Sequence, residues 1–301
     1  MSTGHVEIER AGRALRLSSL DRVLWPAVGF TKRDLLAYYE AIAPVLLPHL
    51  SRRPVTLARF PSGVESSGWY QTNCPAGHPE WVRVAAVAGK SGQTLRYCLI
   101  DEPAALLWAA NLGTIEFHPF LATADRPDAP LSLVFDLDPG LPAGLPECCS
   151  LALHLRDRLD QQKLRALAKT SGAKGLHVLV PLNGSGTFAQ TKSFARAIAR
   201  ELAEAYPLTV TDRMTRAQRP GKVFIDWGQN DPNKSTIAPY SLRATRWPGV
   251  SMPLTWEEVE QVAATGDESL VRFGPSDALS RIDRFGDLMT ACALAGAHRL
   301  R

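Results

Sequence analysis

The stretch Leu131–Gly140, LSLVFDLDPG, constrains the fold more than any other part of the sequence. Its apolar run is rich in β-branched and aromatic residues and ends at a Pro-Gly turn signal, so it predicts a buried strand. Asp136 and Asp138 lie at the end of this strand. Because alternate side chains of a strand point to the same face, both carboxylates are expected to project into one site. Adjacent like charges repel unless a cation lies between them, so the pattern indicates a divalent-metal site; the alternative is two solvated strand-end aspartates.

A third carboxylate, Asp226, lies in the apolar segment 223–227, VFIDW, which also predicts a strand. A buried carboxylate without a partner is costly, so Asp226 is expected either to bind a cation or to become protonated.

Composition is that of an ordinary globular protein, with 301 residues, 45% of them hydrophobic and 21% charged. No apolar run approaches the roughly 18 residues of a membrane span, and the N-terminus lacks the apolar core of a signal peptide, so a cytoplasmic protein is expected. A net charge of +4 permits a polyanionic partner without demanding one. The five cysteines are odd in number and contain no C-x-x-C pair, which argues against both a disulfide framework and a zinc site.

The patterns before the Asp-x-Asp strand predict an αβ arrangement. A short hairpin is expected over residues 5–17, and Thr31 with Asp34 forms a capping box that opens a helix closed by Pro44 and Pro48. Further expected elements are strands at 54–60, 81–87, 94–100 and 114–120 and a helix at 103–111. The loop 124–130, ADRPDAP, is the expected boundary between two modules, residues 1–125 and 126–301, of a single domain.

The second part alternates again between strands and helices. Helices are expected at 146–159, at 187–206 and from Thr255, with a helical remainder to Arg301. Residues 164–182 predict a strand, a Gly-rich turn and a strand, and residues 235–243 predict one more strand.

Three local features favour binding of a polyanion or of bases, each with a plainer alternative. The turn 170–175 carries Ser171 and Lys174 among glycines, which is typical of an anion-binding nest or of a plain hairpin. Lys32 lies in the first turn of a helix, where the helix dipole favours anions rather than cations. It therefore either binds an anion there or is a solvated surface residue. Trp69 and Tyr70 in a Gly/Ser-rich loop predict either a stacking platform or one core ring and one exposed ring.

The motifs LVFDLDPG, TSGAKGLHVLVPL and VFIDWGQN followed by IAPYSLR resemble, in that order, the polymerase domain of bacterial DNA ligase D and its stand-alone relatives. These belong to the archaeo-eukaryotic primase superfamily. The likeness also includes SSLDRVLWP, GFTKRDLLAYYEAIAPVLLPHL, RPVTLARFP and IEFHPF, so it spans nearly the whole chain. The implied fold is α/β (α+β): an N-terminal αβ module packed on a catalytic module whose antiparallel sheet is related to the RNA-recognition motif.

The resemblance implies a role for each matching residue. The metal ligands and catalytic residues would be Asp136, Asp138 and Asp226, holding two Mg²⁺ or Mn²⁺ ions. The nucleotide contacts would be Ser171, Lys174, His177, His118, Arg243, Gln229 and Tyr70. Arg22 and Lys32 would bind the 5′-phosphate of a recessed or gapped DNA end, and Trp69 would lie toward the template. Relatives often have Phe at 69 and 70 and Lys at 22 and 72, so Thr72 leaves one expected DNA contact in doubt.

The implied activity is template-dependent, DNA-primed nucleotide addition: gap filling and end extension in the repair of double-strand breaks by end joining. The resemblance also implies a preference for ribonucleotides and partnership with the bacterial Ku end-binding protein and a ligase. It implies a cytoplasmic, nucleoid-associated location and no membrane partner. The sequence contains no Lys-x-Asp-Gly, the nucleotide-accepting motif of the ligase module, so this chain is not expected to seal nicks.

Two functions of other classes compete with this one. A phosphatase of the haloacid dehalogenase type also uses an Asp-x-Asp strand end, but it expects a nearby Thr or Val that this sequence lacks at Leu141. A DNA-end-binding scaffold with a silent site is the non-enzymatic alternative, and the intact set of three carboxylates argues against it.

Overall fold

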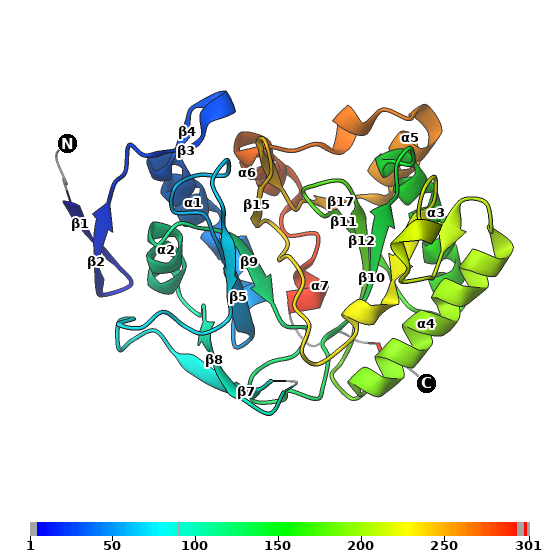
Figure 1. The fold of residues 1–301 in the computed structure, drawn as a ribbon, viewed down its shortest axis with the longest axis horizontal. Coiled ribbons are helices and arrows are strands. Elements are labelled where there is room, and N and C mark those ends of the chain that lie inside the picture. Colours follow the sequence, from blue (N-terminus) through cyan, green and yellow to red (C-terminus); the bar gives the residue numbers. More distant parts are fainter. Residues whose placement is uncertain (1–4, 90, 294–297, 300–301) are drawn as a thin grey trace.

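Two large sheets and three two-stranded ones, with helices packed around them, make up the computed structural model, which describes residues 5–89, 91–293 and 298–299. In Figure 1 the hairpin β1–β2 and helix α1 lie at the left, helices α3 and α4 lie at the right, and strands β10 and β12 stand between them. The mixed α/β class and the antiparallel pairing around β10 confirm the predicted fold class.

The six-stranded sheet has the order β13-β14-β10-β12-β11-β17, and all its neighbours pair antiparallel except β13 and β14. Its strands are β13 (Val210–Thr211), β14 (Val223–Asp226), β10 (Ser132–Pro139), β12 (Leu176–Pro181), β11 (Leu167–Thr170) and β17 (Pro253–Leu254). Helices α3 (Leu145–Asp160), α4 (Phe188–Ala205) and α5 (Trp256–Thr265) bury their apolar residues against it. Leu133, Phe135 and Leu137 of β10 lie in this core. The alternation of a strand therefore sends Asp136 and Asp138 to the opposite face.

The five-stranded sheet has the order β6-β5-β8-β7, with β9 on the other side of β5. Its strands are β6 (Trp69–Gln71), β5 (Pro54–Arg59), β8 (Thr94–Leu99), β7 (Val84–Ala88) and β9 (Thr114–Pro119). Helices α1 (Lys32–Leu50) and α2 (Pro103–Asn111) cover it, and the capping box of Thr31 and Asp34 opens α1 as predicted.

Smaller elements complete the fold. They are β1 (His5–Arg10), β2 (Arg13–Ser18), β3 (Val23–Trp25), β4 (Phe30–Thr31), β15 (Leu242–Ala244), β16 (Pro248–Val250), α6 (Pro275–Phe285) and α7 (Thr290–Ala293). Ala238, Tyr240 and Val250, although late in the chain, pack in the same core as α1 and the five-stranded sheet. The division at residues 124–130 therefore stays a prediction.

Two predicted element boundaries are wrong. Helix α1 continues through Pro44 and Pro48 to Leu50, because its buried face of Ile42, Leu46 and Leu50 keeps packing into the core and outweighs the lost N–H groups. The segment 235–243 is not one strand, because regular strand pairing begins only at Leu242. The residues before it make isolated backbone hydrogen bonds to β9 and to Ser251. The C-terminal part is only partly helical, in α6 and α7, and residues 294–297 and 300–301 lie outside the described residues.

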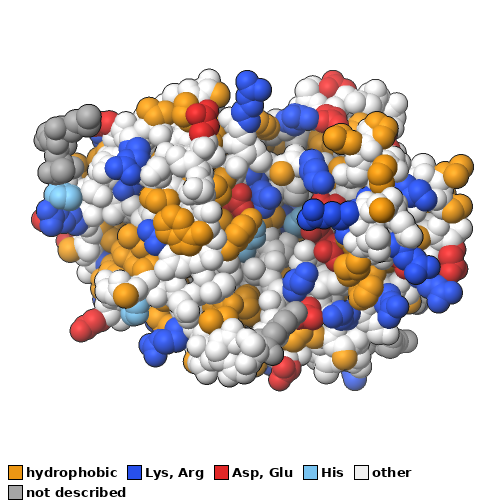
Figure 2. All heavy atoms as spheres, viewed as in Figure 1, with side chains coloured by type: hydrophobic (Ala, Val, Ile, Leu, Met, Phe, Trp, Pro, Cys, Tyr) orange, Lys and Arg blue, Asp and Glu red, His pale blue; other side chains and the backbone are white. Residues whose placement is uncertain are grey.

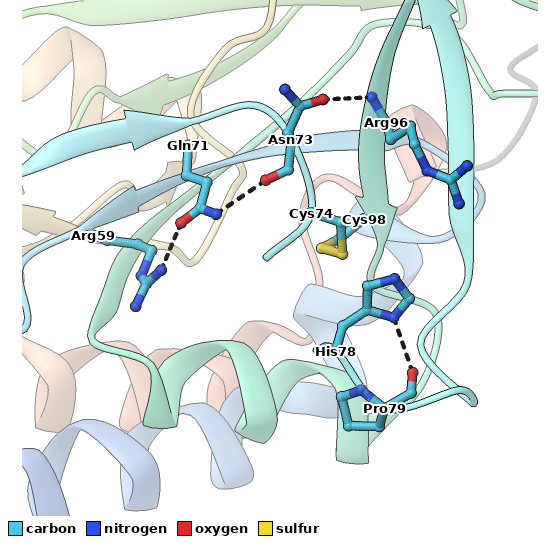
Figure 3. The surroundings of a disulfide bond; sticks show 8 residues. All are labelled: Arg59, Gln71, Asn73, Cys74, His78, Pro79, Arg96 and Cys98. Carbon is cyan, nitrogen blue, oxygen red and sulfur yellow. Dashed lines mark hydrogen bonds between the residues drawn. A yellow bond between two sulfur atoms is a disulfide. The ribbon is translucent and has the colours of Figure 1, made fainter. Parts of the chain in front are cut away.

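Cys74 and Cys98 form a disulfide, which runs against the argument from the cysteine count that the chain has no disulfide framework. The two residues lie 24 apart in sequence, one in the loop after β6 and one on β8. A cysteine count cannot reveal such a meeting, because the sheet creates it. Figure 3 shows the hydrogen bonds beside the disulfide, where Arg96 N donates to Asn73 Oδ1 (2.8 Å) and Gln71 Nε2 donates to Asn73 O (3.1 Å).

The other three cysteines, Cys148, Cys149 and Cys292, are buried free thiols. No helix within the described ranges is both long and apolar enough to span a membrane.

Candidate active site

The antiparallel register of the six-stranded sheet brings the predicted carboxylates together. Asp136 on β10 lies directly opposite Asp226 on β14, and Asp138 lies two residues further along the same face of β10. The side chain of Asp136 is 16% exposed. The sequence therefore predicted both the Asp-x-Asp pair and the third carboxylate, and the register supplies their common face.

Burial is the main influence on the pKa of Asp136 and of Asp226. Burial, followed by the charges of Asp138 and Asp226, raises the pKa of Asp136 to about 7, and burial raises that of Asp226. Gln229 bridges the two strands, because its Nε2 donates to Asp136 Oδ2 (3.4 Å) and to Asp226 Oδ2 (3.3 Å). Gln229 thus contacts the carboxylates, and its Oε1 is buried without a hydrogen-bond partner. The charges of Lys169 and Arg243 oppose the rise in the pKa of Asp136, and that of Lys234 opposes the rise at Asp226, so the carboxylates lie among several cations.

No group of three or more His, Cys, Asp or Glu side chains is preassembled as metal ligands in the part of the chain that the structure describes. The donor chemistry nevertheless fits a hard divalent cation, since carboxylate oxygens of Asp136 and Asp226 converge on the same Gln229 amide nitrogen. The roles of Asp136, Asp138 and Asp226 as metal ligands stay a prediction.

His177 completes the carboxylate cluster from the other side of β10. It lies opposite Asp136 in the β10–β12 register, and its Nε2 is 3.3 Å from Asp136 Oδ1. Its Nδ1 is 3.3 Å from the hydroxyl of Thr236. Burial, reinforced by the charge of Lys169, lowers the pKa of His177 well below its usual value, so the imidazole is neutral at pH 7.

The Gly-rich turn between β11 and β12 lies beside this cluster. The hydroxyl of Ser171 accepts hydrogen bonds from the N–H groups of Ala173 (3.2 Å) and Gly175 (3.1 Å), which closes the turn. Gly172 has a φ of +74°, and a Cβ there would lie 2.6 Å from Arg243 Cγ. Lys174 Nζ donates to Pro139 O (3.3 Å), at the end of the Asp-x-Asp strand. The turn therefore brings Ser171, Lys174 and Arg243 close to one another and to β10.

Glu116 organises a second cluster and is the residue that sequence reasoning left out of the site. Its carboxylate is 2.7 Å from His118 Nε2 and 3.2 Å from Arg243 Nη1, and it accepts a hydrogen bond from Ala244 N (2.9 Å). Burial alone would raise the pKa of Glu116, but His118 and Arg243 hold it below its usual value. The sequence did carry a signal, since Glu116 and His118 share one face of β9.

Tyr70 and Trp69 are both exposed, by 63% and 45%, so neither is the core ring of the plainer interpretation. The ring of Tyr70 meets His118 edge to face, with centroids 5.4 Å apart. Arg59 lies 5.0 Å over the ring of Trp69. The exposed ring of Tyr70 therefore adjoins the Glu116 cluster, whereas the exposed ring of Trp69 adjoins Arg59. Figure 2 shows acidic, basic and histidine side chains meeting near the middle of this face of the molecule.

Arg22 and Lys32 form a separate cationic site at the start of α1. Lys32 is buried, with 6% of its surface exposed, and its Nζ donates to Ser18 O (2.6 Å). Arg22 Nη1 donates to Pro61 O (2.8 Å). Burial, followed by the charge of Arg22, lowers the pKa of Lys32 to about 8. The burial of Lys32 contradicts the interpretation of this residue as a solvated surface lysine. A buried ammonium next to a guanidinium is unfavourable unless an anion lies near them.

The family model described as the LigD primase-polymerase domain matches residues 31–289 of this chain. The chain belongs to the LigD primase-polymerase domain family. The fold agrees, since the polymerase domain from Mycobacterium tuberculosis ligase D, solved in complex with DNA, superimposes with a TM-score of 0.86 at 35% identity. That match includes 93% of this chain and 98% of the other, and it confirms the predicted primase-like fold and the predicted family.

Curated relatives are multifunctional proteins of non-homologous end joining. The LigD protein of Mycolicibacterium smegmatis is 38% identical over 277 residues, and that of Pseudomonas aeruginosa is 32% identical over 279 residues. The alignments include 91% and 86% of this chain but only 35% and 31% of those relatives. The chain thus spans about a third of their length.

Proposed function

We propose that this primase-polymerase domain adds nucleotides to a DNA primer opposite a template strand, filling gaps and extending ends during double-strand break repair. The observation that carries the proposal is the pairing of Asp136 with Asp226 across β10 and β14, with Asp138 on the same face. Family membership makes it a nucleotidyltransferase, and three carboxylates beside a cationic turn suit phosphoryl transfer.

In the proposed reaction the primer 3′-OH attacks the α-phosphorus of a nucleoside triphosphate. A new P–O bond forms, the bond to the β-phosphate breaks, and pyrophosphate leaves. Asp136, Asp138 and Asp226 would hold two Mg²⁺ or Mn²⁺ ions, which when bound would lower the pKa of the hydroxyl and neutralise the leaving group. His177, neutral and 3.3 Å from Asp136 Oδ1, would orient that carboxylate.

Cationic side chains next to the carboxylates would bind the triphosphate. Lys174 and Arg243 supply positive charge from the two sides of the Gly172 turn, and Ser171 supplies a hydroxyl. Such charge-assisted contacts are each worth about 1.5–3 kcal/mol. His118 and Arg243 are held in place by Glu116, and Tyr70 would stack on the incoming base with Trp69 beside it toward the template.

The 5′-phosphate of a gapped or recessed end would bind between Arg22 and Lys32. Their mutual proximity at the first turn of α1, where the helix dipole favours negative charge, supports an anion there. Cooperation with the Ku end-binding protein and with a ligase is proposed from the family alone.

Primer extension on gapped DNA, with labelled ribonucleotides and deoxyribonucleotides, tests the proposal. We expect template-directed addition that requires a divalent cation, stops with a chelator and is faster when the downstream strand carries a 5′-phosphate. Tight binding of 5′-phosphorylated ends without nucleotide incorporation would instead favour the end-binding scaffold. Release of inorganic phosphate without incorporation would favour a phosphatase.

A further inference from the structure

A polar depression of about 810 Å³ lies between α4 and the connection from β13 to β14, outside the site described above. Its walls include Arg196 and Arg200 of α4, Arg213 after β13, and Gln218 and Lys222 before β14. We propose that this depression binds the sugar-phosphate backbone of the primer strand upstream of its 3′ end. The inference rests on the proposed polymerase function and adds a substrate contact to it.

The depression adjoins the residue that follows the proposed metal ligand Asp226. Trp227 follows Asp226 in sequence, and its Nε1 donates to the carbonyl of Asp212 in the depression wall (3.2 Å). Arg196 lies 5.1 Å over the ring of Trp227. Trp227 thus places the depression beside the end of β14, and we infer that a strand whose 3′-OH lies at Asp226 continues past this end of the sheet toward α4.

The charge of the depression suits a phosphate backbone because its carboxylates are already neutralised. Ion pairs join Glu201 to Arg158 (2.7 Å), Glu204 to Arg200 (2.8 Å) and Asp212 to Arg213 (3.6 Å).

Arg196 and Lys222 form no ion pair with any described residue, and Arg196 is exposed. Lys222 is half-buried, and its Nζ donates to Pro207 O (2.6 Å), which leaves further N–H groups for a ligand. These two cations are therefore available for phosphate oxygens.

The lining also indicates which part of a strand would bind. Among the described residues that line the depression there is no aromatic side chain, so bases have no surface on which to stack. Trp69 and Tyr70, by contrast, expose their rings on the other sheet. The depression is thus suited to backbone contacts that do not depend on sequence.

The position of the depression relative to the 5′-phosphate site agrees with an upstream strand. Figure 1 shows α4 on one side of β10 and the start of α1 on the other. Figure 2 shows Lys and Arg side chains gathered on the right of this face, the part that holds α4 in the same view. Downstream and upstream parts of a gapped duplex would therefore leave the site in opposite directions.

Fluorescence anisotropy with two DNAs tests the proposal. One is a primer–template duplex without a downstream strand, and the other is a 5′-phosphorylated duplex with a 3′ template overhang and no primer. Arg196→Ala should weaken binding of the first about tenfold, and Arg196→Ala with Lys222→Ala more, while binding of the second is unchanged. The slope of log affinity against log salt for the first DNA should fall by about one per lost cation.

Arg156→Ala, on helix α3, is the matched control, because Arg156 also lies 5.1 Å over an indole ring, that of Trp256 on α5. It should leave both affinities unchanged. Since Arg196→Ala removes an exposed side chain, it tests the proposal even if Lys222→Ala proves unstable.

An equal loss on both DNAs, or no loss on the primer–template duplex, would overturn the inference. Primer extension by the wild type, measured separately, keeps the two proposals distinct. An Arg196-dependent upstream affinity without nucleotide addition would refute the polymerase and leave the binding surface. Nucleotide addition by a protein whose primer–template affinity does not depend on Arg196 would support the polymerase and refute the binding surface.

Discussion

The two sheets position their functional side chains by different means. In the six-stranded sheet, Asp136, Asp226 and His177 lie on three neighbouring strands at directly opposed positions, so backbone pairing fixes them. In the five-stranded sheet, Tyr70 and Trp69 lie on the edge strand β6, which pairs with β5 on one side only, and both side chains are exposed. Groups that would hold metal are thus placed by the rigid ladder, whereas groups that would touch bases are free to adjust to them.

The largest effect is expected from a change on the rigid ladder. Asp136→Asn keeps the shape of the side chain but removes a proposed metal ligand, and should lower the rate of nucleotide addition on the order of a thousandfold or more. DNA binding should stay nearly unchanged, because this carboxylate is proposed to hold metal rather than DNA. Single-turnover primer extension measures the rate, with exposed Asp128→Asn as the control. Near wild-type extension by Asp136→Asn would exclude this residue from the metal site.

The predictability of the two sheets differs in the same way. The period of two along β10 was enough to predict that Asp136 and Asp138 share a face, and the apolar surroundings of Asp226 were enough to mark it. What the sequence could not show is the strand order β14-β10-β12, because pairing between segments this far apart depends on the whole sheet.

Residues whose role depends on tertiary contacts were missed for the same reason. Glu116 joins His118 on β9 to Arg243 on β15, and only the fold brings those strands together. Lys169 is fully buried with its Nζ 2.6 Å from Ser251 Oγ, and burial lowers its pKa to about 7, yet its sequence context is that of an ordinary strand. The local pattern of Pro44 and Pro48 predicts a helix end, although burial of one face of α1 carries the helix past them.

A change at Glu116 tests whether the second cluster acts by positioning. Glu116→Gln keeps the volume but loses the charge that holds His118 and Arg243, so the KM for the nucleotide should rise about tenfold with a smaller change in kcat. Steady-state extension at varied nucleotide concentration separates the two constants. The exposed Glu65→Gln serves as the control. A loss in kcat with no change in KM would place Glu116 in the chemical step instead.

A pH titration tests the cation pair at the start of α1. Burial and the charge of Arg22 lower the pKa of Lys32 to about 8, so its ammonium is present at pH 7 and is lost as the pH rises above 8. The affinity advantage of 5′-phosphorylated over unphosphorylated gapped DNA should therefore fall several-fold between about pH 7 and pH 9.

Lys32→Arg provides the comparison, because a guanidinium keeps its charge throughout this range. Its phosphate preference should vary less with pH than that of the wild type. An equal decline in both proteins would assign the titration to another group.

The smallest effect on activity is expected at the Cys74–Cys98 disulfide, which touches none of the proposed site residues. It is connected to Trp69 through Gln71, which accepts a hydrogen bond from Arg59 Nη1 (2.6 Å), and through Arg59, which lies over the ring of Trp69. Cys74→Ser should change nucleotide addition by less than about threefold while lowering the free energy of unfolding by about 2–4 kcal/mol.

Urea unfolding and primer extension at a temperature well below the transition give the two quantities. A thiol reductant should reproduce the loss of stability in the wild type and leave Cys74→Ser unaffected, which ties the effect to this bond. If Cys74→Ser instead slows extension as much as Glu116→Gln does, the edge strand β6 depends on the loop behind it. The contrast between a fixed ladder and an adjustable edge would then be wrong for Trp69 and Tyr70.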